Sequence, residues 1–381
     1  MQPNSHHAPD QRMQQIALAR QAVLFDGKSM LQAASQTWIE RSWQRCLASG
    51  KKPDQKVSFD TVEPNAKQRL VDANRALLQT ARPMLQSLSQ AIASTRYFAL
   101  MTDAQGVVID AAGVIDRSDR RADLITRIGT DLSEHTLATT AISAALTELQ
   151  PVWLHRGEHF FDANSIYSCA GAPVFGPDGI CIGMLDLTGI EAVERPELRH
   201  LVAQSARSIE NALTIGCALK HQDLLVRLNW PGRTLGDETD GLVCLNADGY
   251  VLAANQMARL MVPQLTTGSA ATQHASDLFA MQSDMLFDAA RRHGSAAALE
   301  VPLWTGLRLY ALPMSGGPAT PAKPAQFNAP CTPPPPLKDI ETALIRKAVD
   351  EARGNVQKAA KSLGISRATV YRRLGTALKR L

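Results

Sequence analysis

The sequence predicts an α+β fold whose last part is entirely helical. Alternating apolar stretches, each next to a turn that contains Asp and Gly, predict strands in two places along the chain. Longer stretches with apolar residues three and four positions apart predict the helices that flank these strands. Residues 315–336 contain eight prolines, which favour an extended spacer before the helical end.

The composition allows two or three domains with hydrophobic cores, since 45% of the 381 residues are hydrophobic. No apolar run approaches the roughly 18–20 residues that span a bilayer. The polar N-terminal residues lack the apolar core of a secretion signal, so we expect a cytoplasmic protein. The six cysteines are dispersed and form no C-x-x-C pair, so we expect neither disulfides nor a metal or other cofactor.

Two helices are predicted before the first strand. In residues 37–47 the apolar side chains recur at helical spacing, and Gly50 and Pro53 end the helix. Residues 65–92 carry apolar residues at intervals of seven, beginning with Leu70 and Leu77. This repeat favours packing against another helix, either of a second subunit or of the same chain.

A unit of antiparallel strands between helices is predicted next. Its strands are residues 97–102, 107–110, 152–155, 167–175 and 180–188, with tight turns at 103–106 and 176–179. Its helices are residues 133–149, capped by Asp131 or Ser133, and residues 194–225. A smaller unit follows, with strands 241–245 and 250–254 around the turn Asp248-Gly249, a helix from Asn255 and a closing strand at 303–312.

Residues 337–381 have the pattern of a helix-turn-helix. Asn355 and Ser366 are suited to cap two successive helices, and Gly364 is suited to end the first. Small and apolar residues would hold the helices together: Ala359, Ala360, Leu363, Ile365, Val370 and Leu374. The segment carries eleven Lys and Arg against four Asp and Glu, whereas the whole chain has a net charge of only +4. A basic module on a slightly acidic body is typical of nucleic-acid binding, although a cationic helical cap on a domain is the alternative.

The run GNVQKAAKSLGISRATVYRRL, residues 354–374, resembles the Fis-type DNA-binding domain of bacterial enhancer-binding regulators. The resemblance implies that the domain dimerises through residues 340–352. It also implies that the second helix of the motif reads double-stranded DNA, at an operator that is an imperfect palindrome. The residues placed at the DNA are Lys358, Lys361, Ser366, Arg367, Thr369, Tyr371, Arg372 and Arg373.

Residues 139–149 and the following PVWLHRGEHFFDANSIYSCAGAPVFGPDGICIGMLDLTG resemble the GAF domain of acetoin-catabolism-type regulators. The resemblance implies a small organic effector between the sheet and the loops. The candidate effector-binding residues are His135, His159, Phe160, Tyr167, Ser168 and Cys169, and the alternative is that these are ordinary core and loop residues. Residues 241–257 resemble the start of a PAS domain.

These resemblances divide the chain into five parts. We expect an N-terminal helical segment (1–63), a GAF-like domain with flanking helices (64–228) and a PAS-like domain (235–314). A Pro-rich linker (315–336) and a Fis-type helix-turn-helix domain (337–381) follow.

Regulators with this order of domains usually carry an ATPase domain before the DNA-binding domain. The phosphate-binding pattern G-x-x-x-x-G-K-[ST] and the G-A-F-T-G-A loop do not occur in this sequence. We therefore expect a homodimeric, ligand-responsive regulator of a catabolic operon that acts with RNA polymerase at ordinary promoters. It should neither hydrolyse ATP nor act as an enzyme.

Two alternatives remain open. The chain could form mixed dimers with a full-length, ATPase-containing paralogue. It could also be a zinc or thiol enzyme, because residues 155–159 fit the pattern H-x-x-E-H and Cys169 could be a reactive thiol. The zinc pattern requires a helix, which Gly157 and the preceding apolar strand disfavour.

Replacing Arg367 and Arg372 together by Ala should abolish the preference for the operator and leave weak, salt-sensitive binding. Each base-reading Arg that is lost should cost about 1–3 kcal/mol of discrimination, whereas a phosphate contact should weaken binding to all sequences alike. Affinities for the operator and for a scrambled duplex at several salt concentrations measure both effects. A double variant that footprints the operator like the parent protein would show that these residues do not read DNA.

Overall fold

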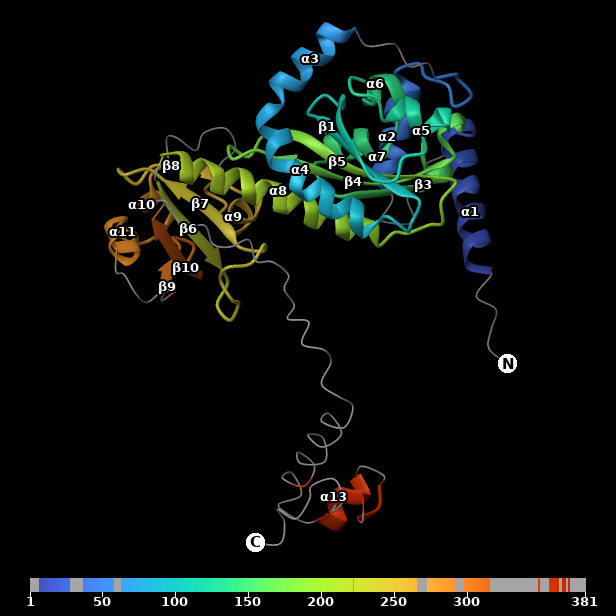
Figure 1. Cartoon of the computed structure of the whole chain (residues 1–381). Coiled ribbons are helices and arrows are strands. Elements are labelled where there is room, and N and C mark those ends of the chain that lie inside the picture. The colour runs from blue at the N-terminus through green and yellow to red at the C-terminus, as the bar shows by residue number, and fades with distance from the viewer. Residues whose placement is uncertain are drawn as a thin grey trace. The chain divides into compact units, whose positions relative to one another are not determined.

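The computed structural model describes residues 7–27, 37–57, 63–221, 223–265, 273–291, 298–315, 349, 356–362, 365–367 and 369–370. The chain divides into two units, residues 1–317 and 318–381, and each is described by itself. Two five-stranded antiparallel sheets form the first unit (Figure 1). Within the described ranges, no helix combines the length and the apolar character needed to cross a membrane.

The first sheet confirms the predicted hairpins. Its strands, in the spatial order β2-β1-β5-β4-β3, are β1 Tyr97–Asp103, β2 Val108–Ala112, β3 Val152–His155, β4 Tyr167–Phe175 and β5 Cys181–Ile190. The carboxylate of Asp103 shapes the first turn, because its Oδ1 accepts the N–H groups of Gln105 and Val107, each at 2.9 Å. Gly106 in this turn has a φ of 85°, which favours glycine.

Helices cover both faces of the first sheet (Figure 1). α4 (Arg75–Ala91) and α8 (Leu198–His221) pack on one face, where Leu85 and Val202 are buried with Ala170 and Leu185. The shorter helices α5 (Arg120–Ile125), α6 (Glu134–Leu137) and α7 (Ala141–Glu148) lie over the other face. Since side chains alternate along a strand, successive residues of β4 and β5 enter two different cores.

Two predicted helices are broken. The helix expected at 65–92 is α3 (Pro64–Ala73) followed by α4, and the break is at Asn74, whose side-chain N–H donates to the carbonyl of Leu70 at 3.0 Å. The helix expected at 133–149 is α6 and α7, separated at Ala138, which has a φ of 56°. Asp131 and Ser133 therefore do not cap one long helix. Thr140 caps α7 instead, in a reciprocal pair with Ser143.

The second sheet has the order β8-β7-β6-β10-β9. Its strands are β6 Leu224–Asn229, β7 Gly241–Leu245, β8 Val251–Ala254, β9 Leu299–Pro302 and β10 Arg308–Ser315. The predicted helix at 194–225 was too long, because its last residues belong to β6. The predicted closing strand at 303–312 is instead a turn followed by β10.

Asn255 begins the helix of the second sheet, as predicted. Its side chain accepts the N–H of Ala258 at 2.8 Å and so caps α9 (Gln256–Met261). α9, α10 (Ala275–Leu278) and α11 (Asp284–Arg291) supply the helical side of one hydrophobic core. α8 covers the other face of the sheet, where Ala218 is buried against Leu242 and Cys244. α8 is therefore shared by the two sheets.

The N-terminal segment packs beside α6 and α7. It comprises α1 (His7–Arg20), a π-helical turn η1 (Gln21–Phe25) and α2 (Thr37–Ala48). The predicted apolar stripe of α2 is confirmed, because Ile39, Trp43 and Cys46 are buried. They pack against Phe160 and Phe161, which follow β3.

The second unit is described in part. α13 (Val356–Ser362) lies within it, and Ala360 and Val370 are buried together. Ser366 caps the next helix as predicted, since its hydroxyl accepts the N–H of Thr369 at 3.1 Å. The Pro-rich linker, Asn355, Leu363, Gly364 and Leu374 lie outside the described residues.

Replacing Leu85 by Ala should destabilise the protein by about 2–5 kcal/mol, because this side chain is only 2% exposed between α4 and the sheet. The matched change of Leu70 to Ala should cost about 1 kcal/mol or less, because α3 has no buried residues. Urea denaturation measures both. Equal losses, with dissociation of subunits in the Leu70 variant, would assign the seven-residue repeat to a subunit interface.

Candidate ligand-binding site

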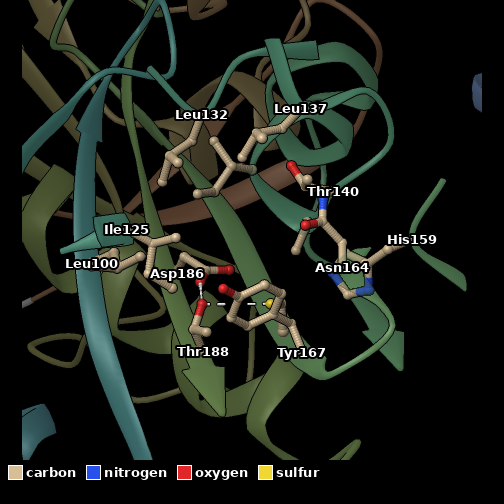
Figure 2. Close-up of a pocket in the computed structure, with 13 residues that line it drawn as sticks. Leu100, Ile125, Leu132, Leu137, Thr140, His159, Asn164, Tyr167, Asp186 and Thr188 are labelled. Carbon is tan, nitrogen blue, oxygen red and sulfur yellow. Dashed lines mark hydrogen bonds between the residues drawn. The ribbon is translucent and has the colours of Figure 1, made fainter. Parts of the chain in front are cut away.

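A cavity of about 40 Å³ lies between the first sheet and the short helices that cover it (Figure 2). In the view of Figure 2, Leu100 and Ile125 lie on one side of it and His159 and Asn164 on the other. The described residues that line it are Leu100, Ile125, Leu132, Leu137, Thr140, Ala141, Ile142, His159, Asn164, Tyr167, Cys169, Asp186 and Thr188. The walls are therefore mostly apolar, with a few polar groups.

The register of the central hairpin brings three polar residues together on one side of the cavity. β4 and β5 pair Cys169 with Thr188, and Asp186 projects from the same face two residues earlier in β5. The hydroxyl of Thr188 donates to Asp186 Oδ2 and lies 3.5 Å from the sulfur of Cys169. Asp186 Oδ1 is buried and has no hydrogen-bond partner among the described residues.

Burial controls the ionisation of these groups. It raises the pKa of Asp186 to about 7, because the charged carboxylate loses its water and the bond from Thr188 offsets only part of this loss. It also raises the pKa of the Cys169 thiol well above its ordinary value. Near neutral pH the thiol is therefore uncharged and the carboxyl is only partly ionised.

His159 presents a second unpartnered polar atom. The preceding turn has Arg156 in the left-handed region, with a φ of 52°, and places the Arg156 carbonyl 2.9 Å from His159 Nδ1. Because a carbonyl only accepts, Nδ1 carries the proton and Nε2 keeps its lone pair. Burial lowers the pKa of His159 to about 4, so the ring is neutral at pH 7. Nε2 is buried without a partner among the described residues.

The cavity thus combines apolar walls with two unpaired polar atoms, an arrangement suited to binding a small polar molecule. Buried polar groups are normally hydrogen-bonded, so each exception requires an explanation. Among the described residues, no Lys or Arg lines the cavity. No group of three or more His, Cys, Asp or Glu placed to hold a metal ion occurs in the part of the chain that the structure describes.

The structure brings together three of the six predicted effector-binding residues. His159, Tyr167 and Cys169 line the cavity. Ser168 faces the opposite side of the sheet, since neighbouring residues of a strand alternate, and its hydroxyl lies 2.8 Å from His155 Nδ1. The remaining two lie elsewhere: Phe160 is buried against α2, and His135 is exposed.

The sequence reasoning missed four polar residues of the lining: Thr140, Asn164, Asp186 and Thr188. A signal existed for Asp186, because it is the one charged residue within the apolar stretch 180–190. A charge in the middle of a strand with apolar neighbours on both sides is unusual unless that face is either exposed or functional.

The H-x-x-E-H residues do not converge. His155 ends β3 and is directed to Ser168, whereas His159 lines the cavity. Between them, the Glu158 carboxylate accepts the backbone N–H of His155 at 2.6 Å and pairs with Arg12 at 3.0 Å. The two imidazoles therefore do not share a helical face, as the zinc pattern would require.

The predicted DNA-binding residues lie in the second unit. Lys358 and Arg367 are exposed, Ser366 caps a helix and Thr369 is half-buried beside it. Lys361 lies in α13. Tyr371, Arg372 and Arg373 lie outside the described residues.

Replacing Asp186 by Asn should make stability less sensitive to pH between about 4 and 7. The folded protein holds the carboxyl proton up to about pH 7, whereas the unfolded chain releases it near pH 4. Rising pH therefore disfavours the folded state of the parent protein across this window, and Asn cannot ionise. We expect the free energy of unfolding of the variant, relative to the parent, to increase by about 1–4 kcal/mol from pH 4 to 7.

Urea denaturation at several pH values measures this difference. Burial also raises the pKa values of Glu158 and Glu210 to about 7, but both proteins contain these residues, so their contributions cancel in the difference. Parallel stability curves for the two proteins would show that Asp186 is ionised normally and is not desolvated.

Comparison with known proteins places the chain in a family. Residues 14–211, more than half of the chain, match the family described as the MimR N-terminal domain. Residues 336–375 match the family described as bacterial regulatory protein, Fis family. Among solved structures, the complex of DhaR(N) with DhaL from E. coli is similar, with 15% identity, a TM-score of 0.44 and coverage of 72% of this chain and 98% of that chain.

Two curated relatives carry names that refer to acetoin. The acetoin catabolism regulatory protein of Cupriavidus necator is 28% identical over 312 residues, which cover 79% of this chain and 44% of that protein. The acetoin dehydrogenase operon transcriptional activator AcoR of Bacillus subtilis is 25% identical over 226 residues, which cover 59% of this chain and 36% of that protein. The chain spans less than half the length of these relatives. The predicted resemblance to acetoin-type regulators is confirmed, and the chain belongs to the family of the MimR N-terminal domain, with a Fis-family helix-turn-helix at its C-terminal end.

Proposed function

We propose that this protein is a transcriptional regulator that binds specific DNA through its helix-turn-helix and responds to a small, uncharged organic effector in the cavity of the first sheet. The observation that carries the proposal is the buried cavity with two unpaired polar atoms, Asp186 Oδ1 and His159 Nε2. It lies in a chain whose other end matches the Fis family. In this proposal the cavity binds the effector and the helix-turn-helix binds DNA.

The cavity favours a small and neutral effector. Its volume of about 40 Å³ is far below that of pockets for drug-sized ligands, roughly 300–1,000 Å³. A carboxylate effector would lose its water without gaining a cation, because the described residues of the lining include no Lys or Arg, and Asp186 would repel it. A hydroxyl group can donate to His159 Nε2, and a carbonyl group can accept from the protonated form of Asp186. A short hydroxyketone such as 3-hydroxybutan-2-one (acetoin) has both groups, and two relatives are named for acetoin.

The output is proposed to be a homodimer on a palindromic operator that acts with RNA polymerase and without ATP. The sequence has no G-x-x-x-x-G-K-[ST] pattern. In sequence, residues 22–29 come close to it, with Ala22 in place of the first glycine, but residues 22–25 belong to the helical turn η1. A phosphate-binding loop follows a strand instead. ATP turnover that copurifies with the protein would contradict this part of the proposal.

We take the first sheet with its helices as the GAF-like domain and the second sheet with its helices as the PAS-like domain. The first sheet with its helices fits a sensor that encloses its ligand, because the cavity is built from strands on one side and short helices on the other. Because β6 belongs to the second sheet, we propose a boundary between these domains near residue 223, whereas the sequence predicts one between 228 and 235. The Cys169 thiol, whose pKa is raised by burial, and the divergent His155 and His159 support a regulatory role over an enzymatic one.

Adding 3-hydroxybutan-2-one should raise the melting temperature of the protein, because a compound that binds only the folded state stabilises it by mass action. At a concentration about 100 times its dissociation constant, the expected gain is roughly 2.7 kcal/mol. Butyrate, which has a carboxylate and a similar size, should give no rise. Differential scanning fluorimetry with a panel of short ketones, diols and carboxylates measures the order of preference.

Replacing Cys169 by Phe should fill the cavity and abolish the rise with every neutral compound. The matched change of Cys181 to Phe adds the same ring on the same hairpin, at a half-buried position that does not line the cavity, and should leave the rise intact. A rise that survives in the Cys169 variant would place the effector elsewhere. Stabilisation by carboxylates alone would contradict the proposed class of effector.

A further inference from the structure

The wall of the cavity that contains His159 and Asn164 is not part of the sheet or of the helices that cover it. Most of the lining belongs to strands β1, β4 and β5 and to helices α5 and α7, whose residues are part of the hydrophobic core. His159 and Asn164 instead belong to residues 156–164, which form two 3-10 turns and no strand. Opening the strands would break the sheet, whereas opening residues 156–164 would not.

Arg20, the last residue of α1, is the main support of this segment. Its guanidinium donates to the carbonyls of Gly157 at 2.8 Å, Phe160 at 3.1 Å and His159, and it pairs with the carboxylate of Asp162. It therefore contacts the backbone on both sides of the cavity residue His159. The side chain is only 12% exposed, which is rare for arginine.

Trp43 and Gly157 pack closely around the side chain of Arg20. Its guanidinium lies 5.8 Å from the centre of the Trp43 ring, and the indole N–H of Trp43 donates to the carbonyl of Glu158 at 3.0 Å. A side chain at Gly157 would come within 3.2 Å of Arg20. A buried cation is costly unless its donors are satisfied, and here three backbone carbonyls and the carboxylate of Asp162 accept from the guanidinium.

We propose that residues 156–164 are the cover through which the effector enters the cavity, and that Arg20 is the positioning residue that holds this cover closed and His159 in place. The proposal rests on the proposed function, because it takes the cavity to be the effector site. Opening this segment would break its contacts with the N-terminal helices, including those of Phe160 and Phe161 with α2, and would leave the pairing of the strands intact. The N-terminal segment thereby becomes part of the effector site without lining it.

The test uses Cys169 as a reporter in the full-length protein. This thiol lines the cavity and is 7% exposed, so methyl methanethiosulfonate should reach it only when the cover opens. In the Arg20→Gln variant we expect Cys169 to be modified roughly ten- to a hundredfold faster, because the cover loses its charged hydrogen bonds. The matched variant Arg41→Gln loses a surface ion pair with Glu148 and should label like the parent protein. Mass spectrometry of the cysteine-containing peptides gives the rate for each thiol.

Cys244 separates local opening from unfolding, since it is fully buried in the second sheet. Faster labelling of Cys169 with unchanged labelling of Cys244 supports the proposal. An unchanged rate at Cys169, or equal acceleration at both thiols, overturns it. If Arg20→Gln does not fold, Arg20→Lys and Asp162→Asn remove parts of the same contacts, and no acceleration in either variant also overturns the proposal. The labelling needs no effector, so its result stands even if melting experiments show that the cavity binds none.

Discussion

The pairing register of β4 and β5 is the constraint on which the rest of the structure depends. It sets Cys169 opposite Thr188, with Asp186 on the same face, and turns Ala170 and Leu185 to the opposite face. One face of the hairpin therefore lines the cavity, and α4 and α8 pack against its other face. A slip of one residue would put Asp186 into the apolar core under α8 and would remove the cavity's polar groups. Between the Cys169–Thr188 pair and the turn at 176–179, the register shifts once, at Val174 and Phe175.

Two buried polar residues of the cavity lower the stability of the folded protein, and this cost supports a binding role for them. Asp186 and His159 are both buried, and each leaves one atom without a partner among the described residues. Such atoms cost about 1–3 kcal/mol each in a folded protein. Burial adds the further cost of keeping Asp186 ionised above pH 7. Apolar residues of similar size would remove these costs, so a ligand that pairs with the two atoms offers a physical reason for their presence.

Much of the fold could be predicted from local chemistry, and the departures have tertiary causes. Hairpins were predicted correctly where Asp and Gly define the turn, as at Gly106. The break between α6 and α7 coincides with a distant contact that the sequence does not show: Thr139 Oγ1 lies 2.7 Å from the hydroxyl of Ser42 in α2. Strand alternation placed Asp186 and Leu185 on opposite faces, but it could not show that short helices cover the Asp186 face. His135 was grouped with the effector residues by sequence position, and the break at Ala138 separates it from them.

The central claim is that a small neutral molecule occupies the cavity of the first sheet, between Asp186 and His159. A crystal structure of the full chain soaked with 3-hydroxybutan-2-one tests it most directly. We expect density for one molecule with an oxygen within hydrogen-bond distance of His159 Nε2 and another near Asp186 Oδ1. An empty cavity with the compound bound at another site, or density in the cavity for butyrate and none for the hydroxyketone, would contradict it.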